Sequence, residues 1–479
     1  MSESTFFWYD LETTGINPRE DRIVQFAGQR TSLALEPIGE PVNLLIRLTD
    51  DVLPSPDAVL VTGITPQMTV ADGITEVEFL KIFHETVATP GTIFAGYNSI
   101  RFDDEFMRHL LFRNFYDAYA WQWQDDRSRW DLLDAVRMTR ALRPDGIKWP
   151  VVGGRPTNSL EQLTRANNIE HANAHDALAD VEACIAVARL IRTHHPKLFD
   201  WLVGSRHKNA VKSLVETGEP FVYSSGKYDN DYEKTTVVVQ LLVHPKGQGS
   251  LVYDLRHDPD EFTSLDAPEL ANRWRWMREP EAPARLPIKT LQYNRCPAVA
   301  PLGVLDTASQ QRLHLPLSVI QTNLNKLKAA TSFSDTVARA LDILDQAQQK
   351  RIQIQVNEPE AQLYDGFVDA ADAQLSRAFR AADTSELATI AKDFTDTRLR
   401  AIAPRYKARN FIVHLTDEER ADWEAFRYER LMQGGVDSRL AKFMHRLGEL
   451  AKSTTESNKL FLLEELQLYA ESIMPVQDT

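Results

Sequence analysis

The feature that most constrains the fold of this chain is a run of four large apolar side chains followed directly by two carboxylates. Residues 6–9 read FFWY, and Asp10 and Glu12 come next. In an extended strand, side chains at positions i and i+2 project to the same face, so both acids would lie together. Two buried anions repel each other and lose hydration, and a bound metal cation is the simplest remedy. The alternative is that the strand ends at Tyr9 and the acids are solvated in the following Thr-Thr-Gly turn.

The segments that follow alternate between strand and helix patterns as far as Pro196. Their apolar residues have the period of a strand or of a helix. The predicted strands cover 23–35, 41–48 and 92–98, and the predicted helices cover 76–87, 104–115 and 174–195. This alternation predicts an α/β domain over residues 1–196.

The pattern changes twice after residue 196. Residues 220–228, 235–245 and 249–255 are rich in β-branched and aromatic residues and are separated by Gly, Pro and Asp turns. We expect a small β barrel or sandwich with added helices over 197–352. The remainder, 353–479, has helical periodicity almost throughout and predicts a helical domain. Three domains agree with a length of 479 residues at about 150 residues per domain.

Charge and cysteine content limit the classes of function that this chain can have. The net charge of −14 argues against a surface that binds polyanions everywhere, but 271–295 holds six basic residues against two acids, and 398–409 holds five against none. The only cysteines, Cys184 and Cys296, lie far apart, which indicates neither a disulfide framework nor a zinc site. No signal-like or membrane-length apolar segment is present, so we predict a soluble cytoplasmic protein without a membrane partner.

More acids occur where helices of the first region begin. Asp103 and Asp104 follow the predicted strand 92–98, and Asp180 lies five residues after His175. The first two could simply be helix N-terminal residues, and His175 an ordinary loop histidine. Asp180 is flanked by small and apolar residues, where a buried acid needs a partner. Five helical residues span about 500°, so we place His175 on the loop that enters the helix.

The order of these residues resembles the DEDDh exonucleases of the RNase H-like fold: D-x-E on a first strand, Asp after a middle strand, and H-x4-D at a closing helix. Longer strings resemble the bacterial exonuclease I family, among them DLETTG, GYNSIRFDDE, SRWDLLD, EHANAHDALADV, AQLYDGF and KARNF. The resemblance implies a multidomain α/β protein with an RNase H-like DEDDh exonuclease domain, a small SH3-like β-rich domain and a C-terminal helical domain. It also implies a single-strand-specific 3′→5′ DNA exonuclease.

The resemblance assigns a role to each site residue. Asp10 would bridge two Mg²⁺ ions, Glu12 and Asp180 would hold the ion that carries the nucleophilic water, and Asp103 would support the other. Asp103 is chosen over its neighbour because it matches the first Asp of the family string RFDDE. Oxygen ligands suit Mg²⁺, with Mn²⁺ as a substitute. His175 would be the general base, since an ordinary histidine pKa of about 6.5 allows it to accept a proton near neutral pH.

Aromatic and basic side chains that are interleaved between residues 100 and 165 suit a single strand, which is held by stacking and by backbone cations. By family position, Arg108, Tyr119, Trp123 and Arg137 are the predicted DNA contacts, whereas Trp130 is expected in the core. The basic stretches NRWRWMR, YNRC and RYKARNF are expected to extend this groove over the other domains.

Three further residues are predicted near the 3′ nucleotide. Glu12 and Thr13 end the first strand, and Ser159 stands where the family usually has a basic residue. A hydroxyl can hydrogen-bond a phosphate but brings no charge, and the nearby Arg155 or Arg165 would have to compensate.

The leading hypothesis is therefore a Mg²⁺-dependent exonuclease that degrades single-stranded DNA processively to 5′-mononucleotides in repair and recombination. A DEDDh exonuclease for RNA or short oligonucleotides is disfavoured by the roughly 280 residues beyond the first domain. A non-catalytic nucleic-acid adaptor is disfavoured because all five site residues are present. The resemblance further implies binding of the C-terminal tail of single-stranded-DNA-binding protein, near Arg143 or on the second domain, by a monomeric enzyme.

Overall fold

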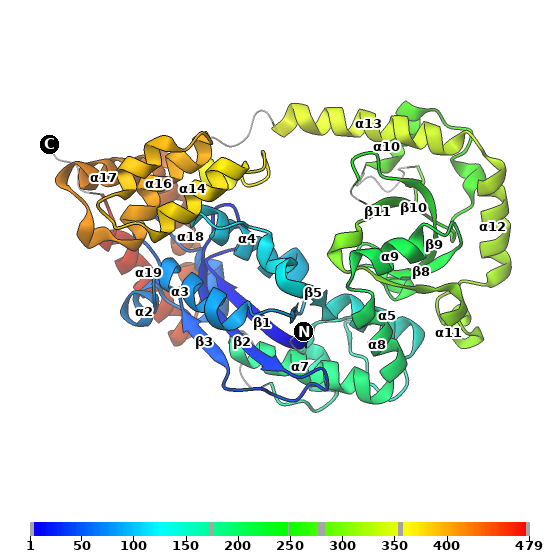
Figure 1. Cartoon of the computed structure of the whole chain (residues 1–479). Coiled ribbons are helices and arrows are strands. Elements are labelled where there is room, and N and C mark those ends of the chain that lie inside the picture. Colours follow the sequence, from blue (N-terminus) through cyan, green and yellow to red (C-terminus); the bar gives the residue numbers. More distant parts are fainter. Residues whose placement is uncertain (1–3, 172–175, 248, 276–282, 353–357, 476–479) are drawn as a thin grey trace.

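The computed structural model describes residues 4–171, 176–247, 249–275, 283–352 and 358–475. Figure 1 shows a mixed sheet with its helices in the middle, a second sheet with helices on one side, and a group of helices on the other. The exact boundaries that we predict, after residues 196 and 352, stay predictions. No helix in the described ranges has the length and apolar character needed to cross a membrane.

The first sheet has five strands in the order β3-β2-β1-β4-β5. β1 is antiparallel to β2 and parallel to β4, and β4 is parallel to β5. The strands are β1 (Thr5–Thr13), β2 (Ile23–Thr31), β3 (Val42–Leu45), β4 (Thr92–Gly96) and β5 (Ser128–Asp131). The three predicted strands after β1 are thus present, each shorter than predicted.

Helices cover both faces of this sheet. They are α1 (Pro56–Thr62), α2 (Pro66–Asp72), α3 (Glu76–Ile82), which continues as a π-helix over Phe83–Val87, α4 (Asp103–Arg113), α5 (Leu132–Leu142), α6 (Leu160–Ala166) and α7 (Ala177–His194). A two-residue hairpin, β6 (Val151–Val152) and β7 (Arg155–Pro156), precedes α6.

β1 is buried on both of its faces, which explains the four consecutive large apolar residues. Phe6 and Trp8 pack with residues of α5 and α7 in one cluster, while the odd-numbered residues pack with α3 and α4 in another. The strand continues to Thr13, so the alternative in which it ends before the acids is wrong. Because Asp10 and Glu12 continue the alternation of Phe6 and Trp8, they project toward the α7 side.

The second sheet is antiparallel, in the order β11-β10-β9-β8-β12. Its strands are β8 (Phe221–Ser224), β9 (Thr235–Val243), β10 (Ser250–Asp254), β11 (Ile288–Leu291) and β12 (Ala298–Pro301). The surrounding helices are α8 (Pro196–Gly204), α9 (Lys208–Val215), α10 (Ala267–Trp274), α11 (Thr307–Arg312), α12 (Leu317–Ala329) and α13 (Phe333–Ile352). One hydrophobic cluster runs from β1, α5 and α7 into this sheet, so the first two units share a core.

The C-terminal unit is helical, as predicted. Its helices are α14 (Ala370–Ala381), α15 (Leu387–Ile390), α16 (Thr397–Asn410), α17 (Asp417–Met432), α18 (Arg439–Ser453) and α19 (Ser457–Ser472). Figure 1 shows it beside the first sheet, and α18 and α19 pack against α1.

Buried ion pairs also join the C-terminal unit to the first. Glu360 accepts from Arg22 and from Arg409, each at 2.8 Å, and Arg409 also pairs with Asp51 at 2.8 Å. The expectation that RYKARNF extends a DNA groove is therefore wrong. Its three cations are largely buried and paired with acids: Arg405 with Glu358, Lys407 with Glu419, and Arg409 with Asp51 and Glu360.

Candidate active site

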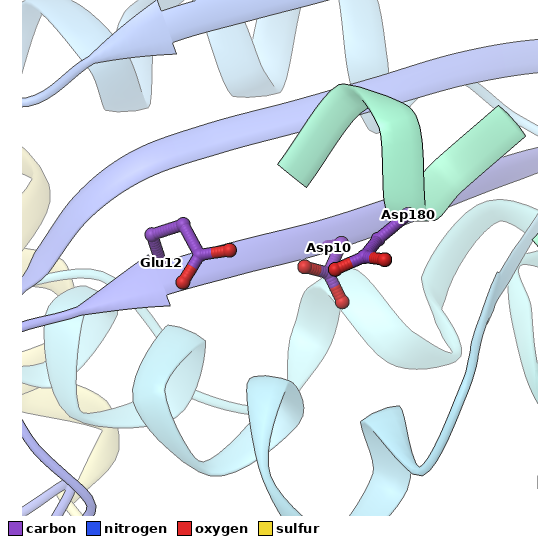
Figure 2. A group of neighbouring side chains, drawn as sticks. All are labelled: Asp10, Glu12 and Asp180. Carbon is purple, nitrogen blue, oxygen red and sulfur yellow. The ribbon is translucent and has the colours of Figure 1, made fainter. Parts of the chain in front are cut away.

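Three carboxylates converge between β1 and α7. Asp10 and Glu12 come from the end of β1, and Asp180 comes from the first turn of α7. One oxygen from each side chain lies within 4.8 Å of the others, a spacing that can hold a metal ion. Figure 2 shows Asp180 reaching from its helix toward Asp10, with Glu12 farther along the strand. The predicted shared face of Asp10 and Glu12 is confirmed.

These acids need a nearby cation to stay ionised at neutral pH. Burial raises the pKa of Asp10 well above its ordinary value, and the charge of Asp180 raises it further. The pKa of Glu12 is raised to about 9, first by burial and then by the charges of Asp10, Asp180 and Asp176. No positive charge within the described part of the chain lowers either pKa. Oxygen donors in this state fit a hard divalent cation, which would keep them ionised.

Asp103 is the first residue of α4, which follows the end of β4. It lies outside the group of three, but the charge of Asp10 acts on it. Its pKa is raised well above the ordinary value by burial and then by Asp10. Asp103 therefore belongs to the same electrostatic site.

The adjacent Asp104 has its own partners. It accepts a hydrogen bond from the Tyr9 hydroxyl at 2.5 Å and forms a buried ion pair with Arg129. The N-cap position of α4 is Phe102, with no side-chain cap, so neither acid caps the helix. Asp104 stabilises the junction between β1, α4 and β5, and this partner set agrees with the choice of Asp103 as the site acid.

His175, the predicted general base, lies outside the described residues. A different histidine contacts the site: His171 Nε2 lies 2.5 Å from Asp180 Oδ1. The sequence contained this residue in the string EHANAH, but its spacing from Asp180 gave no signal for such a contact.

A groove lies beside the middle of α4. Three of the four predicted DNA contacts, Arg108, Tyr119 and Trp123, line a cavity of about 700 Å³. The other units contribute residues that the sequence reasoning did not single out, namely Arg206, His207, Lys208, Tyr364 and Phe367, and the YNRC stretch contributes Arg295. Trp123 is 65% exposed and Phe367 is 91% exposed. Exposed aromatic rings among cations are typical of a surface for single-stranded nucleic acid.

All three units meet at Glu105, whose partners line this groove. Its carboxylate accepts from Arg108 at 2.7 Å, from Arg295 at 3.3 Å and from the Tyr364 hydroxyl. The Arg108 guanidinium also lies 5.6 Å from the centre of the Tyr119 ring. The cation and the ring are therefore held in place by fixed partners.

The structure does not place the remaining predicted contacts in this groove. Arg137 pairs with Asp134 at 2.5 Å and lies against Gly226. Ser159 is exposed at the N-cap position of α6. The Thr13 hydroxyl is buried and donates to the Gly15 carbonyl at 2.7 Å. Substrate contact by these residues stays a prediction.

Comparison with known proteins identifies the family. The family models described as Exonuclease, Exonuclease I SH3-like domain and Exonuclease I C-terminal domain match residues 7–188, 206–343 and 357–473. Exodeoxyribonuclease I of Haemophilus influenzae is 37% identical, covering 99% of this chain and all of the relative. The Escherichia coli enzyme of the same name is 36% identical, covering 98% of each chain. This chain belongs to the exonuclease I family.

Solved structures of the family share the whole architecture. Exonuclease I from Methylocaldum szegediense superposes with a TM-score of 0.91 at 42% identity, covering 98% of this chain and all of that one. E. coli exonuclease I in complex with a dA16 oligonucleotide gives 0.90 at 36%, and an SSB/exonuclease I structure with the inhibitor CFAM gives 0.88 at 35%, both with the same coverage. The predicted three-part fold is confirmed, and the chain is an exonuclease.

Proposed function

We propose that this protein is a divalent-metal-dependent 3′→5′ exonuclease that degrades single-stranded DNA processively to 5′-mononucleotides. The observation that carries the proposal is the convergence of Asp10, Glu12 and Asp180, in a chain that also has a groove of cations and exposed aromatic rings. Relatives named Exodeoxyribonuclease I and an oligonucleotide complex of one of them support the substrate.

Mg²⁺ is the proposed metal, with two ions bound and Mn²⁺ as a substitute. The buried carboxylates fit this group, because an all-oxygen donor set favours hard cations and their raised pKa values reflect missing positive charge. Asp10, Glu12, Asp103 and Asp180 would hold the metal. When bound, Mg²⁺ supplies neutralisation of the phosphodiester and a more acidic water.

The protein's own groups have separate tasks. β1 fixes Asp10 and Glu12 because its flanking residues are buried on both faces. His175, as the proposed general base, would take the proton of the attacking water. Arg108 would bind backbone phosphates, and Tyr119 and Trp123 would stack on bases, which gives binding without base-edge recognition. Glu12, Thr13 and Ser159 are proposed contacts of the 3′ nucleotide, and Arg137 of the strand.

The proposed setting is DNA repair and recombination in the cytoplasm. The SSB/exonuclease I structure supports a complex with single-stranded-DNA-binding protein, which we propose is bound through its C-terminal tail by a monomeric enzyme. Arg143 is partly exposed and pairs with Asp306 of the second unit, so a tail carboxylate can compete for it.

Digestion of end-labelled oligonucleotides tests the proposal. The substrates are matched single-stranded DNA, double-stranded DNA and RNA, with and without Mg²⁺. The wild type should release mononucleotides from the 3′ end of single-stranded DNA only, and Asp10→Ala, Asp180→Ala and His175→Ala should each lose at least about 100-fold in rate. Glu40→Gln, an exposed acid away from the site, is the control and should match wild type. Normal activity in the Asp10 and Asp180 variants would falsify the proposal.

A further inference from the structure

His171 contacts the metal site without being one of its predicted ligands. Its Nε2 lies 2.5 Å from Oδ1 of Asp180, and the histidine side chain is only 4% exposed. An ionised Asp180, the form that binds a metal, can only accept a hydrogen bond, so Nε2 carries a hydrogen and donates it to the carboxylate. One oxygen of Asp180 is thereby already bound.

The other ring nitrogen is also held. Nδ1 of His171 lies 3.2 Å from the Thr164 hydroxyl, and Thr164 is fully buried. The same hydroxyl lies within reach of two carbonyls of its own helix, those of Leu160 at 3.0 Å and Glu161 at 2.9 Å. Because the hydrogen of the neutral ring is on Nε2, Nδ1 can only accept, so the Thr164 hydroxyl donates to it. The imidazole ring is therefore fixed at both nitrogens.

The local fold explains how a residue beyond α6 returns to this position. The helix ends at Ala166, Asn168 takes a left-handed conformation with φ of 53°, and the Ile169 N–H donates to the Thr164 carbonyl at 3.0 Å. This turn brings His171 back over Thr164, and α6 packs on α7. The short helix α6 thus supports the ring through Thr164, and the ring in turn supports Asp180.

We propose that His171 is a positioning residue of the metal site: its Nε2–H holds one oxygen of Asp180 so that the other is available beside Asp10 and Glu12. The inference rests on the metal site proposed above. Asp180 needs such a partner because the charges of Asp10 and Glu12 repel its carboxylate before a cation arrives. A hydrogen bond of this kind orients a metal ligand, and its loss typically weakens metal affinity about 10-fold to 100-fold.

Two polar substitutions separate the hydrogen bond from the bulk of the ring. The amide nitrogen of Gln can reach the position of Nε2, whereas that of Asn reaches only the position of Nδ1. We expect His171→Gln to bind Mn²⁺, the probe, within about 3-fold of wild type, and His171→Asn to bind about 10-fold to 100-fold more weakly. The readout is free Mn²⁺ measured by electron paramagnetic resonance during titration of the DNA-free protein, with Mg²⁺ competition by calorimetry.

The matched control is His109→Gln, which replaces an equally buried histidine of the same domain whose ring contacts the Glu360 carbonyl instead. It should leave Mn²⁺ affinity unchanged, whatever it does to stability. Thr164→Val removes the second support of the ring and should weaken Mn²⁺ binding less than His171→Asn does. Circular dichroism checks that each variant is folded. If His171→Asn does not fold, the Mn²⁺ affinities of His171→Gln and Thr164→Val test the proposal.

The outcomes distinguish this inference from the proposed function. The positioning role is overturned if the Asn and Gln variants bind Mn²⁺ equally well. It is also overturned if Thr164→Val weakens Mn²⁺ binding more than His171→Asn does. In both cases the proposed metal site stands as long as the wild type binds Mn²⁺. Failure of the wild type to bind Mn²⁺ or Mg²⁺ overturns both.

Discussion

Asp103 and Asp104 are neighbours in the sequence, yet the structure gives them opposite surroundings. Asp104 is neutralised by Arg129 and hydrogen-bonded by Tyr9, whereas burial and the charge of Asp10 raise the pKa of Asp103. In the sequence, Asp180 stood out because a carboxylate among apolar residues needs a partner, whereas Asp103 was chosen over Asp104 by its match to the family string. The sequence could not identify partners such as Arg129 or His171, since a hydrogen bond depends on where distant segments meet.

The Asp104–Arg129 pair leads to a prediction about stability. Arg129→Met should lower the free energy of unfolding by about 3–5 kcal/mol, because it leaves a buried carboxylate without its counter-charge. Arg129 also donates to the Asn294 carbonyl of the second unit at 2.7 Å. Urea unfolding followed by tryptophan fluorescence measures the change.

The double variant Arg129→Met/Asp104→Leu should recover part of the loss, since it removes both charges. Arg165→Met breaks the exposed pair with Glu161 and should cost less than about 1 kcal/mol. A similar cost for Arg129→Met and Arg165→Met would contradict the role of the buried pair.

His109 predicts a pH dependence of stability. Burial lowers its pKa to about 4 in the folded protein, below the ordinary value of 6.5. As the pH falls, the unfolded chain therefore binds the proton first, and stability that is present above about pH 6.5 is lost toward pH 4. Between pH 7 and pH 5 this amounts to about 2 kcal/mol.

His109→Gln should remove this contribution and make the urea midpoint less sensitive to pH over that range. His445→Gln replaces an exposed histidine and is the control, which should keep the wild-type slope. Equal slopes in all three proteins would show that His109 is not held unprotonated by burial.

At the level of elements, strands buried on both faces were the most predictable part of the fold. The apolar stretches of β1, β2 and β4 are long enough to be recognised as strands from the sequence alone. β5 was not predicted, because it has four residues and passes directly into α5. Alternation along β1 predicted the shared face of Asp10 and Glu12, and the family resemblance predicted that Asp180 of α7 joins them.

A side chain at Gly96, at the end of β4, would disturb the convergence of β1 and α7. A Cβ there would lie 2.7 Å from Ser99 Cβ and 2.9 Å from the Tyr9 carbonyl, next to Asp10. Gly96→Ala should therefore cost about 1–3 kcal/mol and weaken Mn²⁺ binding, because β4 must move away from β1. Thermal unfolding and Mn²⁺ titration measure the two effects.

Gly204→Ala serves as the comparison, since a Cβ at the end of α8 meets nothing within 4 Å. It should leave Mn²⁺ affinity unchanged and stability equal or slightly higher. Normal Mn²⁺ binding in Gly96→Ala would show that the site does not depend on the close approach of these strands.

At the level of the whole molecule, the two basic stretches of the sequence have different surroundings in the structure. The YNRC stretch places Arg295 in the groove, whereas the 398–409 stretch turns Arg409 inward. Local sequence reports the sign of a charge but not the acids that fold against it. Asp51 lies in the first unit and Glu360 in the C-terminal unit, so the pairing of Arg409 with both acids depends on how these units dock.

Glu360 gives the prediction that belongs to this scale. It is buried between Arg22 of the first unit and Arg409 of α16, and these arginines hold the pKa of its carboxyl well below the ordinary value despite burial. Glu360→Gln should lower the free energy of unfolding by about 3–5 kcal/mol, because two buried cations lose their shared counter-charge. The backbone N–H of Arg22 also donates to the Thr14 hydroxyl at 2.9 Å, so the turn after Glu12 should loosen too.

Hydrogen exchange locates this effect. Amides of α16 and of residues 14–24 should exchange faster in Glu360→Gln, while those of the second sheet should not change, because the variant loosens docking of the C-terminal unit alone. Glu358→Gln, two residues away, is the matched control: its side chain is 33% exposed and its loss should cost less than about 1 kcal/mol. Equal protection in the two variants would mean that docking depends on the apolar contacts of α19 rather than on Glu360.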